Sequence, residues 1–268
     1  MINKNTTDKV NRDYIKQGDC LKLMKEIPDK SIDMILCDLP YGTTACKWDS
    51  IIPFEPLWEQ YERIIKPYHA IVLFGCQPFT TKLINSNFTN FKYTYVWKKT
   101  KAGNFIQAKN MPLKLHEDIC VFSDGVVIHE GQSPKRMPYF PLGVTNVDKE
   151  WNRPKVYDSA HNFKRPSHKT SRKITQEGFP CDILEYGSVH NPPHPTQKPI
   201  ALLEYLIKTY TNEGDVVLDN CMGSGSTCVA TVNTNRHYIG FELDEKYFDI
   251  ARSRISDAIL KRDKRGQV

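Results

Sequence analysis

The sequence predicts an α/β fold with one doubly wound, mostly parallel sheet. Short apolar runs of strand length alternate with segments that have a helical period. Two of these runs, 32–37 and 215–218, lead directly into an acidic residue and then into a loop or a glycine turn. The periodicity disappears between residues 124 and 190, which predicts an irregular insert within the fold.

Length and composition favour one sizeable core over several small domains. The chain has 268 residues, of which 40% are hydrophobic. We therefore expect residues 1–123 and 191–268 to be two halves of one domain, separated by the insert 124–190. The first residues are polar and the longest apolar run, 70–76, is too short to span a bilayer, so we expect a cytoplasmic protein. Eight scattered cysteines without a CxxC pair predict reduced thiols and no metal site.

The first half predicts strands and helices in alternation. Residues 20–27 have an amphipathic helical pattern that Pro28 ends, and residues 54–65 have a second one. Strands are expected at 14–19, 32–37, 70–74, 93–97 and 117–122, with a lysine-rich connection between the last two.

The second half repeats this alternation after the insert. Helices are expected at 200–210, from 227 to 232, and at 243–260. Strands are expected at 215–218, ending at Asp219, and at 237–241, ending at Glu242. No repeat of fixed period is present.

A stiff polar turn, Asp38-Leu39-Pro40-Tyr41, follows the strand at 32–37. Pro40 has no N–H to donate and favours extended backbone at Leu39, so the strand ends here. The turn combines a carboxylate, free backbone carbonyls and an aromatic ring at a strand's carboxyl end, where open α/β sheets bind ligands. An ordinary strand-to-loop turn with a surface tyrosine is the alternative.

The glycine turn Gly223-Ser224-Gly225 lies between Asp219 and Glu242. A strand, a glycine turn, a helix and a strand that ends in an acid are typical of a nucleoside-binding unit, because the acid can accept the ribose hydroxyls. The dinucleotide fingerprint is incomplete, since Cys228 stands at its third small position, and no P-loop Lys follows. The pattern favours S-adenosylmethionine over a dinucleotide.

The insert concentrates the positive charge of the chain. Residues 131–175 contain ten Lys or Arg and three acids, a net charge of +7, whereas the whole chain carries +6. Basic residues interleaved with aromatic ones suit a phosphate backbone and exposed bases. A solvated loop is the alternative. The candidate DNA-binding residues are Lys135, Arg136, Arg153, Lys155, Lys164, Arg165, Arg172 and Lys173.

In their order, these motifs resemble the amino-group DNA methyltransferases of the permuted β class. The Asp38–Tyr41 motif comes first, then the basic insert, then His194-Pro195-Thr196-Gln197-Lys198-Pro199, and the glycine turn comes last. Leu39 replaces the first proline of the family motif, and Asn220-Cys221 replaces Pro-Phe before the glycine turn. The resemblance implies a Rossmann-like methyltransferase sheet, S-adenosylmethionine as cofactor and the insert as target-recognition region.

The resemblance also implies roles for individual residues. Asp38, Leu39, Pro40 and Tyr41 would form the catalytic motif, with the Asp38 carboxylate and the Leu39 carbonyl accepting the hydrogens of a base amino group and Tyr41 stacking on the base. The cofactor would be bound by Asp19, Cys20, Thr196, Lys198, Asp219, Gly223, Ser224, Gly225 and Glu242. Among these, Thr196 and Lys198 would hold the methionine carboxylate. No metal is expected, and His116-Glu117 is interpreted as structural.

The expected activity is methylation of adenine N6 in duplex DNA, because Asp rather than Ser begins the motif within this family. Cytosine N4 as the target and a DNA-binding protein without catalysis are the alternatives, and a dehydrogenase is disfavoured. A restriction endonuclease as partner, and a monomer or homodimer, complete the expectations.

Overall fold

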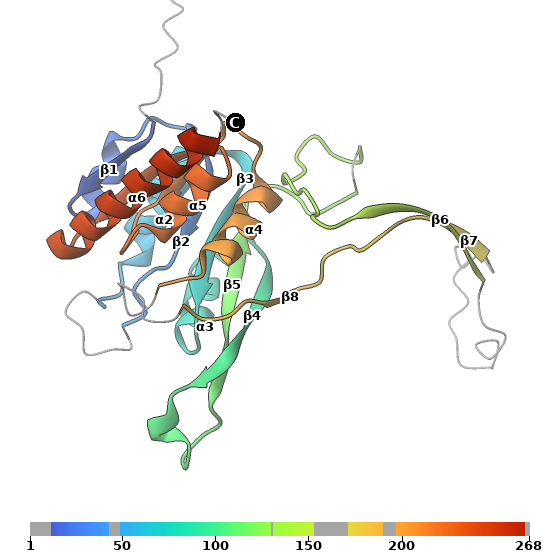
Figure 1. Ribbon diagram of the computed structural model, residues 1–268, viewed down its shortest axis with the longest axis horizontal. Helices are drawn as coiled ribbons and strands as arrows, with labels where there is room; N and C mark the ends of the chain where they lie inside the picture. Colours follow the sequence, from blue (N-terminus) through green and yellow to red (C-terminus); the bar gives the residue numbers. More distant parts are fainter. Residues whose placement is uncertain (1–11, 43–48, 130, 153–170, 190–196, 266–268) are drawn as a thin grey trace, which may run out of the picture. The chain divides into compact units, whose positions relative to one another are not determined.

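The computed structural model describes residues 12–42, 49–129, 131–152, 171–189 and 197–265 (Figure 1). The chain divides into two compact units, Met1–Phe140 with Asp182–Val268, and Pro141–Cys181. Thr196, Arg153, Lys155, Lys164 and Arg165 lie outside the described residues. No helix in the described ranges is both long enough and apolar enough to cross a membrane.

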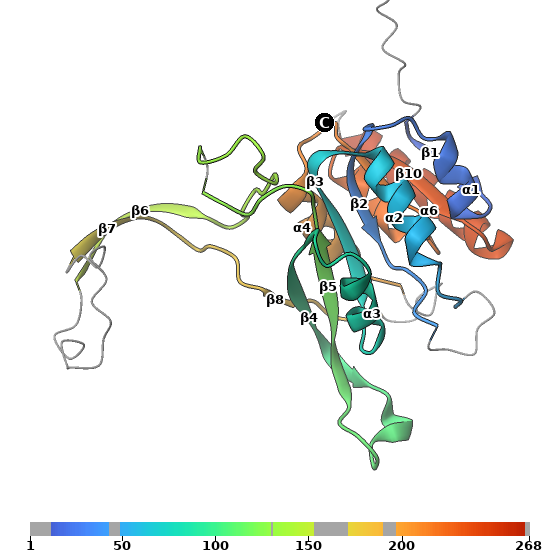
Figure 2. The ribbon, with the colours of Figure 1, turned by 180° about the vertical axis from the view of Figure 1, so that it is seen from behind.

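The first unit is built on an eight-stranded sheet with the order β1-β10-β9-β2-β3-β5-β4-β8 (Figure 2). Neighbouring strands from β1 to β3 are parallel, β5 runs antiparallel to β3 and β4, and β8 is parallel to β4. The predicted doubly wound, mostly parallel sheet is therefore confirmed. The strands are β1 (Tyr14–Gln17), β2 (Ile32–Cys37), β3 (Ile65–Gly75), β4 (Phe91–Gly103), β5 (Lys114–Phe122), β8 (Ile183–Glu185), β9 (Val216–Asp219) and β10 (His237–Glu242).

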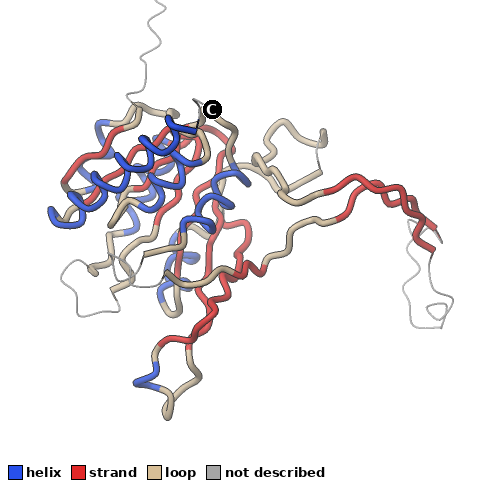
Figure 3. Tube along the Cα trace, in the orientation of Figure 1, coloured by secondary structure: helices blue, strands red, loops and turns tan. Residues whose placement is uncertain are grey.

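Helices cover both faces of this sheet (Figure 3). One face packs against α1 (Cys20–Leu23), the 3₁₀ turn η1 (Met24–Glu26), α2 (Phe54–Ile64) and α3 (Phe79–Ser86). The other face packs against α4 (Ile200–Tyr210) and α5 (Ser226–Asn233), and α6 (Glu245–Arg265) packs against α5.

Strand β2 shows why the central strands are continuously apolar in sequence. Ile35 and Cys37 belong to the core on the α2 side, whereas Met34 and Leu36 belong to the core on the α4 side. Successive side chains of a strand point to opposite faces, so a strand covered on both faces needs apolar residues at every position. The two cores meet across this strand, next to the loop that begins at Asp38.

Several predicted elements differ in extent from the structure. The expected helix 20–27 divides into α1 and the turn η1, after Asp19 caps its start by accepting the backbone N–H of Leu21 at 2.9 Å. Helix α3 was not predicted; its eight residues form only about two turns, so the helical period of Phe79 and Leu83 is easily overlooked. Strands β4 and β5 extend well beyond the predicted 93–97 and 117–122, so much of the lysine-rich connection is a β-hairpin.

The second unit contains an antiparallel pair, β6 (Thr145–Asn152) and β7 (Ser171–Glu177). The expectation of an irregular insert is wrong for these two strands. Both carry few apolar side chains, so neither gives the alternating pattern by which a half-buried strand is detected.

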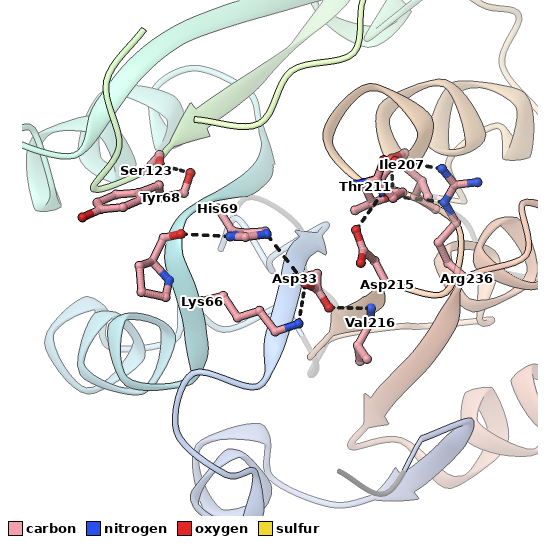
Figure 4. A network of polar contacts seen from close by, with 12 residues as sticks. Asp33, Lys66, Tyr68, His69, Ser123, Ile207, Thr211, Asp215, Val216 and Arg236 are labelled. Atoms are coloured by element: carbon pink, nitrogen blue, oxygen red, sulfur yellow. Dashed lines mark hydrogen bonds and ion pairs between the residues drawn. The ribbon is translucent and has the colours of Figure 1, made fainter. Parts of the chain in front are cut away.

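A polar network joins the start of β2 to its neighbours β3 and β9 (Figure 4). Asp33 is buried, and its Oδ1 lies 2.6 Å from Lys66 Nζ and 3.6 Å from His69 Nε2. Its Oδ2 accepts the backbone N–H of Val216 at 2.9 Å. The buried carboxylate is thus paired, and it holds three strands together at the edge opposite to Asp38.

Candidate active site

A cavity of about 790 Å³ lies at the carboxyl edge of the parallel strands. Strands β2 and β9 are direct neighbours, with Ile35 opposite Leu218, so the residues that follow them meet at this edge. Both Asp38 and Asp219 line the cavity, together with the end of β10 at Glu242. The sheet therefore brings together two motifs that are far apart in sequence, at the position where open α/β sheets bind ligands.

The Asp38 turn is held in place by its own side chains. Tyr41 donates its hydroxyl hydrogen to Asp38 Oδ1 at 2.7 Å, and its ring stacks on Phe79 with the centroids 4.9 Å apart. Leu39 is only 3% exposed and packs into the core. A buried leucine at this position anchors the loop by packing, and the residue also lines the cavity.

A buried lysine lies between two carboxylates at this edge. Lys198 Nζ lies 2.6 Å from Asp38 Oδ2 and 3.1 Å from Glu117 Oε2, and the lysine side chain is 6% exposed. Glu117 also pairs with Lys99. Because β5 runs antiparallel to β3, Glu117 near the start of β5 reaches the edge at which β3 ends. Two acids and two ammonium groups thus form one charge-balanced cluster, which we call the Asp38 cluster.

The Asp38 cluster shifts the pKa of each of its central members. Burial raises the pKa of Asp38, and the counteracting attraction of Lys198 does not fully offset it. Burial also favours neutral Glu117, but Lys198 and Lys99 outweigh it, so the pKa of Glu117 is lowered. Burial opposes charge on Lys198 as well, yet Asp38 and Glu117 together raise its pKa. Lys198 therefore remains protonated and positively charged.

The glycine turn joins the ends of β9 and β10. Gly223 donates its N–H to Glu242 Oε2 at 2.8 Å, and Asp244 donates its N–H to Glu242 Oε1 at 2.8 Å. Gly225 has a φ of 78°, and a Cβ atom there would lie 2.9 Å from Ala251 Cβ on α6. Only glycine fits this position, so the turn lets the backbone pass close to α6 while it lines the cavity.

Asp219 is a buried acid whose carboxylate accepts hydrogen bonds from Cys221, Thr227 and Cys37. Its Oδ1 accepts the N–H of Cys221 at 3.1 Å, and the residue is 4% exposed. Burial raises the pKa of Asp219 to about 7.

This raised pKa makes a prediction for stability. The unfolded chain releases the Asp219 proton near pH 4, whereas the folded chain retains it up to about pH 7. The stability that this group contributes is therefore complete below pH 4 and is lost as the pH rises through 7. We expect Asp219→Asn to remove this loss. The wild type should lose about 2–4 kcal/mol of its free energy of unfolding between pH 5 and pH 8 through this group, and the variant should not. Chemical denaturation at both pH values, without cofactor, measures this difference.

The matched control is Asp118→Asn, a carboxylate on β5 that accepts the hydroxyl hydrogen of Thr80 at 2.7 Å. If the free energy of unfolding depends on pH equally in wild type and Asp219→Asn, folding does not raise the pKa of Asp219 and the prediction is wrong.

Asp19 and Cys20 line the cavity from the end of β1. The Asp19 carboxylate caps α1, as described above, and this fixes the loop between β1 and α1. The seven cysteines in the described residues are free thiols. Within the same residues, no group of three His, Cys, Asp or Glu side chains could hold a metal ion.

The structure thus brings all the described residues of the predicted catalytic and cofactor sets close to one cavity. The lining includes Asp38, Leu39, Pro40, Tyr41, Asp19, Cys20, Lys198, Asp219, Gly223, Ser224 and Glu242, and Gly225 completes the same turn. The ammonium of Lys198 lies at Asp38, whereas the prediction placed it at a cofactor carboxylate. Sequence reasoning missed Glu117 and Lys99.

The described residues of the predicted DNA-binding set are divided between the two units. Lys135 and Arg136 belong to the first unit, where Arg136 donates to the carbonyl of Ile128 at 3.2 Å. Lys173 lies on β7 in the second unit and pairs with Asp148 at 2.8 Å. Arg172 occupies the neighbouring backbone position of β7. Of the aromatic residues in the insert, Tyr139 packs against Tyr210 and the core instead of remaining free.

Comparison with known proteins identifies the family. A family model described as DNA methylase, of the N6/N4 methyltransferases, matches residues 32–253. The chain belongs to this family. The methylase is 43% identical to "Putative methylase YubD" of Escherichia coli over 90% of the chain and 88% of that protein. It is 27% identical to the "DNA adenine methyltransferase YhdJ" of Escherichia coli over 91% of the chain and 83% of that protein.

Solved structures share the fold of the methylase. The M1.HpyAVI–SAM complex superposes with a TM-score of 0.59 at 23% identity, over 90% of this chain and 98% of that one. The PvuII cytosine-N4-specific DNA methyltransferase superposes with a TM-score of 0.61 at 15% identity, over 94% and 93%. The two neighbours confirm the sheet architecture.

Proposed function

We propose that this methylase transfers a methyl group from S-adenosylmethionine to the N6 amino group of a flipped adenine in duplex DNA. One observation carries the proposal. The Asp38 turn, with its two acceptors, and the glycine turn with Glu242 line the same cavity. A base and a nucleoside cofactor bound at these two turns would meet within it.

The residues at the glycine turn fit S-adenosylmethionine. The cofactor has no phosphate, so its site needs acceptors and a close backbone rather than a phosphate cradle. Glu242 is fixed by two backbone N–H groups, and each of its oxygens keeps a further lone pair for the ribose hydroxyls. Asp19 and Cys20 would lie near the adenine ring, Thr196 near the methionine carboxylate, and Asp219, Gly223, Ser224 and Gly225 would line the remainder. Bound S-adenosylmethionine would supply an electrophilic methyl group on its sulfonium.

The Asp38 turn provides the chemistry for an amino group. The lone pair of an exocyclic amino nitrogen is delocalised into the base, so the nitrogen is a poor nucleophile. The Asp38 carboxylate and the Leu39 carbonyl accept its two hydrogens, which favours a pyramidal nitrogen with a free lone pair. Pro40 stiffens the turn, and Tyr41, which lines the cavity, would stack on the base. The rate gain comes from positioning and electrostatics.

Lys198 holds the Asp38 carboxylate in this orientation. With Oδ2 paired to Lys198 and Oδ1 accepting from Tyr41, the carboxyl group cannot rotate freely. The remaining lone pairs of the Asp38 carboxylate therefore have a fixed orientation before a base binds. After transfer the nitrogen carries a positive charge and releases one proton, which the Asp38 carboxylate accepts or passes to water.

Duplex DNA is the proposed substrate because the basic charge of the insert suits a phosphate backbone. A target nitrogen inside a duplex is inaccessible, so the base must leave the stack at a cost of a few kcal/mol. Contacts of the phosphates with the insert residues named above would offset this cost. Adenine rather than cytosine is favoured by Asp at the head of the motif and by the 27% identity to a relative named a DNA adenine methyltransferase.

The test is transfer of a labelled methyl group from S-adenosylmethionine to unmethylated genomic DNA, with separation of the product nucleosides by mass. We expect N6-methyladenine. Formation of N4-methylcytosine would support the same mechanism but show that the target base is cytosine. Cofactor binding without transfer to DNA would overturn the proposed substrate, and absence of cofactor binding would overturn the assignment of the glycine turn.

A further inference from the structure

The β4–β5 hairpin carries side chains that the proposed function does not use. It continues past the sheet between Lys98 and Leu115, a stretch with five lysines and no acid (Figure 1). Lys98 and Lys99 have acidic partners, Glu185 and Glu117. Lys101 and Lys109, nearer the tip, have no ion pair within the described residues, so their charge is free.

The tip of this hairpin is a built turn that exposes apolar side chains. Phe105 is 69% exposed and Ile106 is 93% exposed, within the 3₁₀ turn η2 (Phe105–Gln107). Asn104 enters the turn with a φ of 65°. Backbone hydrogen bonds close it, from Gln107 N–H to the Asn104 carbonyl at 3.0 Å and from Asn110 N–H to the Gln107 carbonyl at 2.8 Å. An ordered turn therefore presents two neighbouring apolar side chains outward.

Residues at the base of the hairpin line the cavity. Trp97 and Lys99 on β4 and Glu117 on β5 line it, and all belong to the same compact unit as Asp38. Phe105 lies six positions after Lys99, a distance of ~20 Å in extended conformation. This length equals roughly six base-pair steps of a duplex at ~3.4 Å each. A two-stranded β-ribbon also fits the major groove, which is ~12 Å wide.

We propose that the β4–β5 hairpin is a second DNA-binding element, in which Lys101 and Lys109 bind phosphates and Phe105 and Ile106 pack against bases beside the flipped nucleotide. The inference rests on the proposed function, because it takes a duplex whose target base enters the cavity. A free positive charge on both sides of an apolar tip matches a polyanion with apolar base faces. The same charge disfavours a second copy of this chain as the occupant, since two hairpins would bring like charges together.

The test compares two double variants by titrating a labelled 30-base-pair duplex at several salt concentrations. Lys101→Gln with Lys109→Gln is expected to lower the slope of log K against log salt by about 2, because two phosphate contacts are lost. Phe105→Ser with Ile106→Ser is expected to weaken binding about tenfold at an unchanged slope. Both variants should bind S-adenosylmethionine with wild-type affinity.

Matched controls come from exposed residues of the same unit. Phe88 is 70% exposed between α3 and β4, and Lys261 is exposed near the end of α6, and neither lines the cavity. Phe88→Ser and Lys261→Gln should leave the titration unchanged. Wild-type affinity and slope in both hairpin variants would overturn the proposal, as would a change from dimer to monomer in the apolar variant with DNA affinity intact. A wild-type chain that binds the cofactor but no duplex would instead overturn the proposed function.

Discussion

Replacing Asp38 with Asn is expected to slow methyl transfer about 100- to 1,000-fold while S-adenosylmethionine still binds. Asn has nearly the same shape, so the turn can form. Its amide oxygen can accept from Lys198, as the carboxylate does at 2.6 Å, but its NH₂ group then replaces the oxygen that accepts from Tyr41, and the side chain carries no charge. The base amino group would then lose a charged acceptor. Single-turnover transfer to DNA and calorimetric cofactor titration measure the two properties separately.

Asp118→Asn serves as the control for this variant as well, because Asp118 is the next residue to Glu117 but does not line the cavity. It should transfer methyl groups at the wild-type rate. Retention of more than a tenth of the wild-type rate by Asp38→Asn would contradict the role of the Asp38 carboxylate as an acceptor.

Replacing Lys198 with Met is expected to lower the free energy of unfolding by about 3 kcal/mol at pH 8, because two partly buried carboxylates lose their shared counter-ion. In the variant, Asp38 and Glu117 repel each other, so their pKa values rise in the folded state. A carboxyl group whose pKa is higher in the folded than in the unfolded state stabilises the folded protein at low pH. This contribution to the free energy of unfolding is lost as the pH rises. The deficit should therefore be smaller at pH 5.5 than at pH 8, which denaturant titrations at both values will measure.

Lys16→Met is the control for loss of a lysine, since the Lys16–Glu26 pair is exposed and should contribute less than about 1 kcal/mol.

The pH–rate profile of Glu117→Gln tests whether the Asp38 cluster positions and tunes the Asp38 carboxylate. Glu117 raises the pKa of Asp38, so its neutralisation should move the acidic limb of the pH–rate profile to lower pH. An unmoved limb, or a Lys198→Met variant as stable as wild type, would refute this account of the cluster.

The parts of the site that the sequence predicts are those that lie within one contiguous stretch. The Asp38 turn and the glycine turn each contain, within a few residues, a strand end, an acid and a residue with special backbone geometry. Their meeting follows from the order of the strands, which the α/β pattern and the resemblance imply. Strand β2 coincides with the predicted range because apolar residues fill both of its faces.

The contacts of Lys198 could not be predicted in this way, because 160 residues separate it from Asp38. A lysine inside a predicted loop gives no indication of its partner. Glu117 could not be predicted either, because it lies between His116 and Asp118 in the polar first half of β5, where an acid is expected to be exposed. Strands β6 and β7 and the outer part of the β4–β5 hairpin gave no signal, because cross-strand pairing of exposed polar residues leaves no hydrophobic period.

The pairing of β2 with β9 also has a consequence for the time course of folding. Asp33 and Val216, joined by a hydrogen bond of 2.9 Å, are 183 residues apart, and Met34 pairs with Val217. Contacts of such sequence separation carry a large loop-closure entropy and form slowly. The cavity needs residues from both sides of this pairing, so a nascent chain acquires its ligand site only after β9 and β10 have emerged from the ribosome.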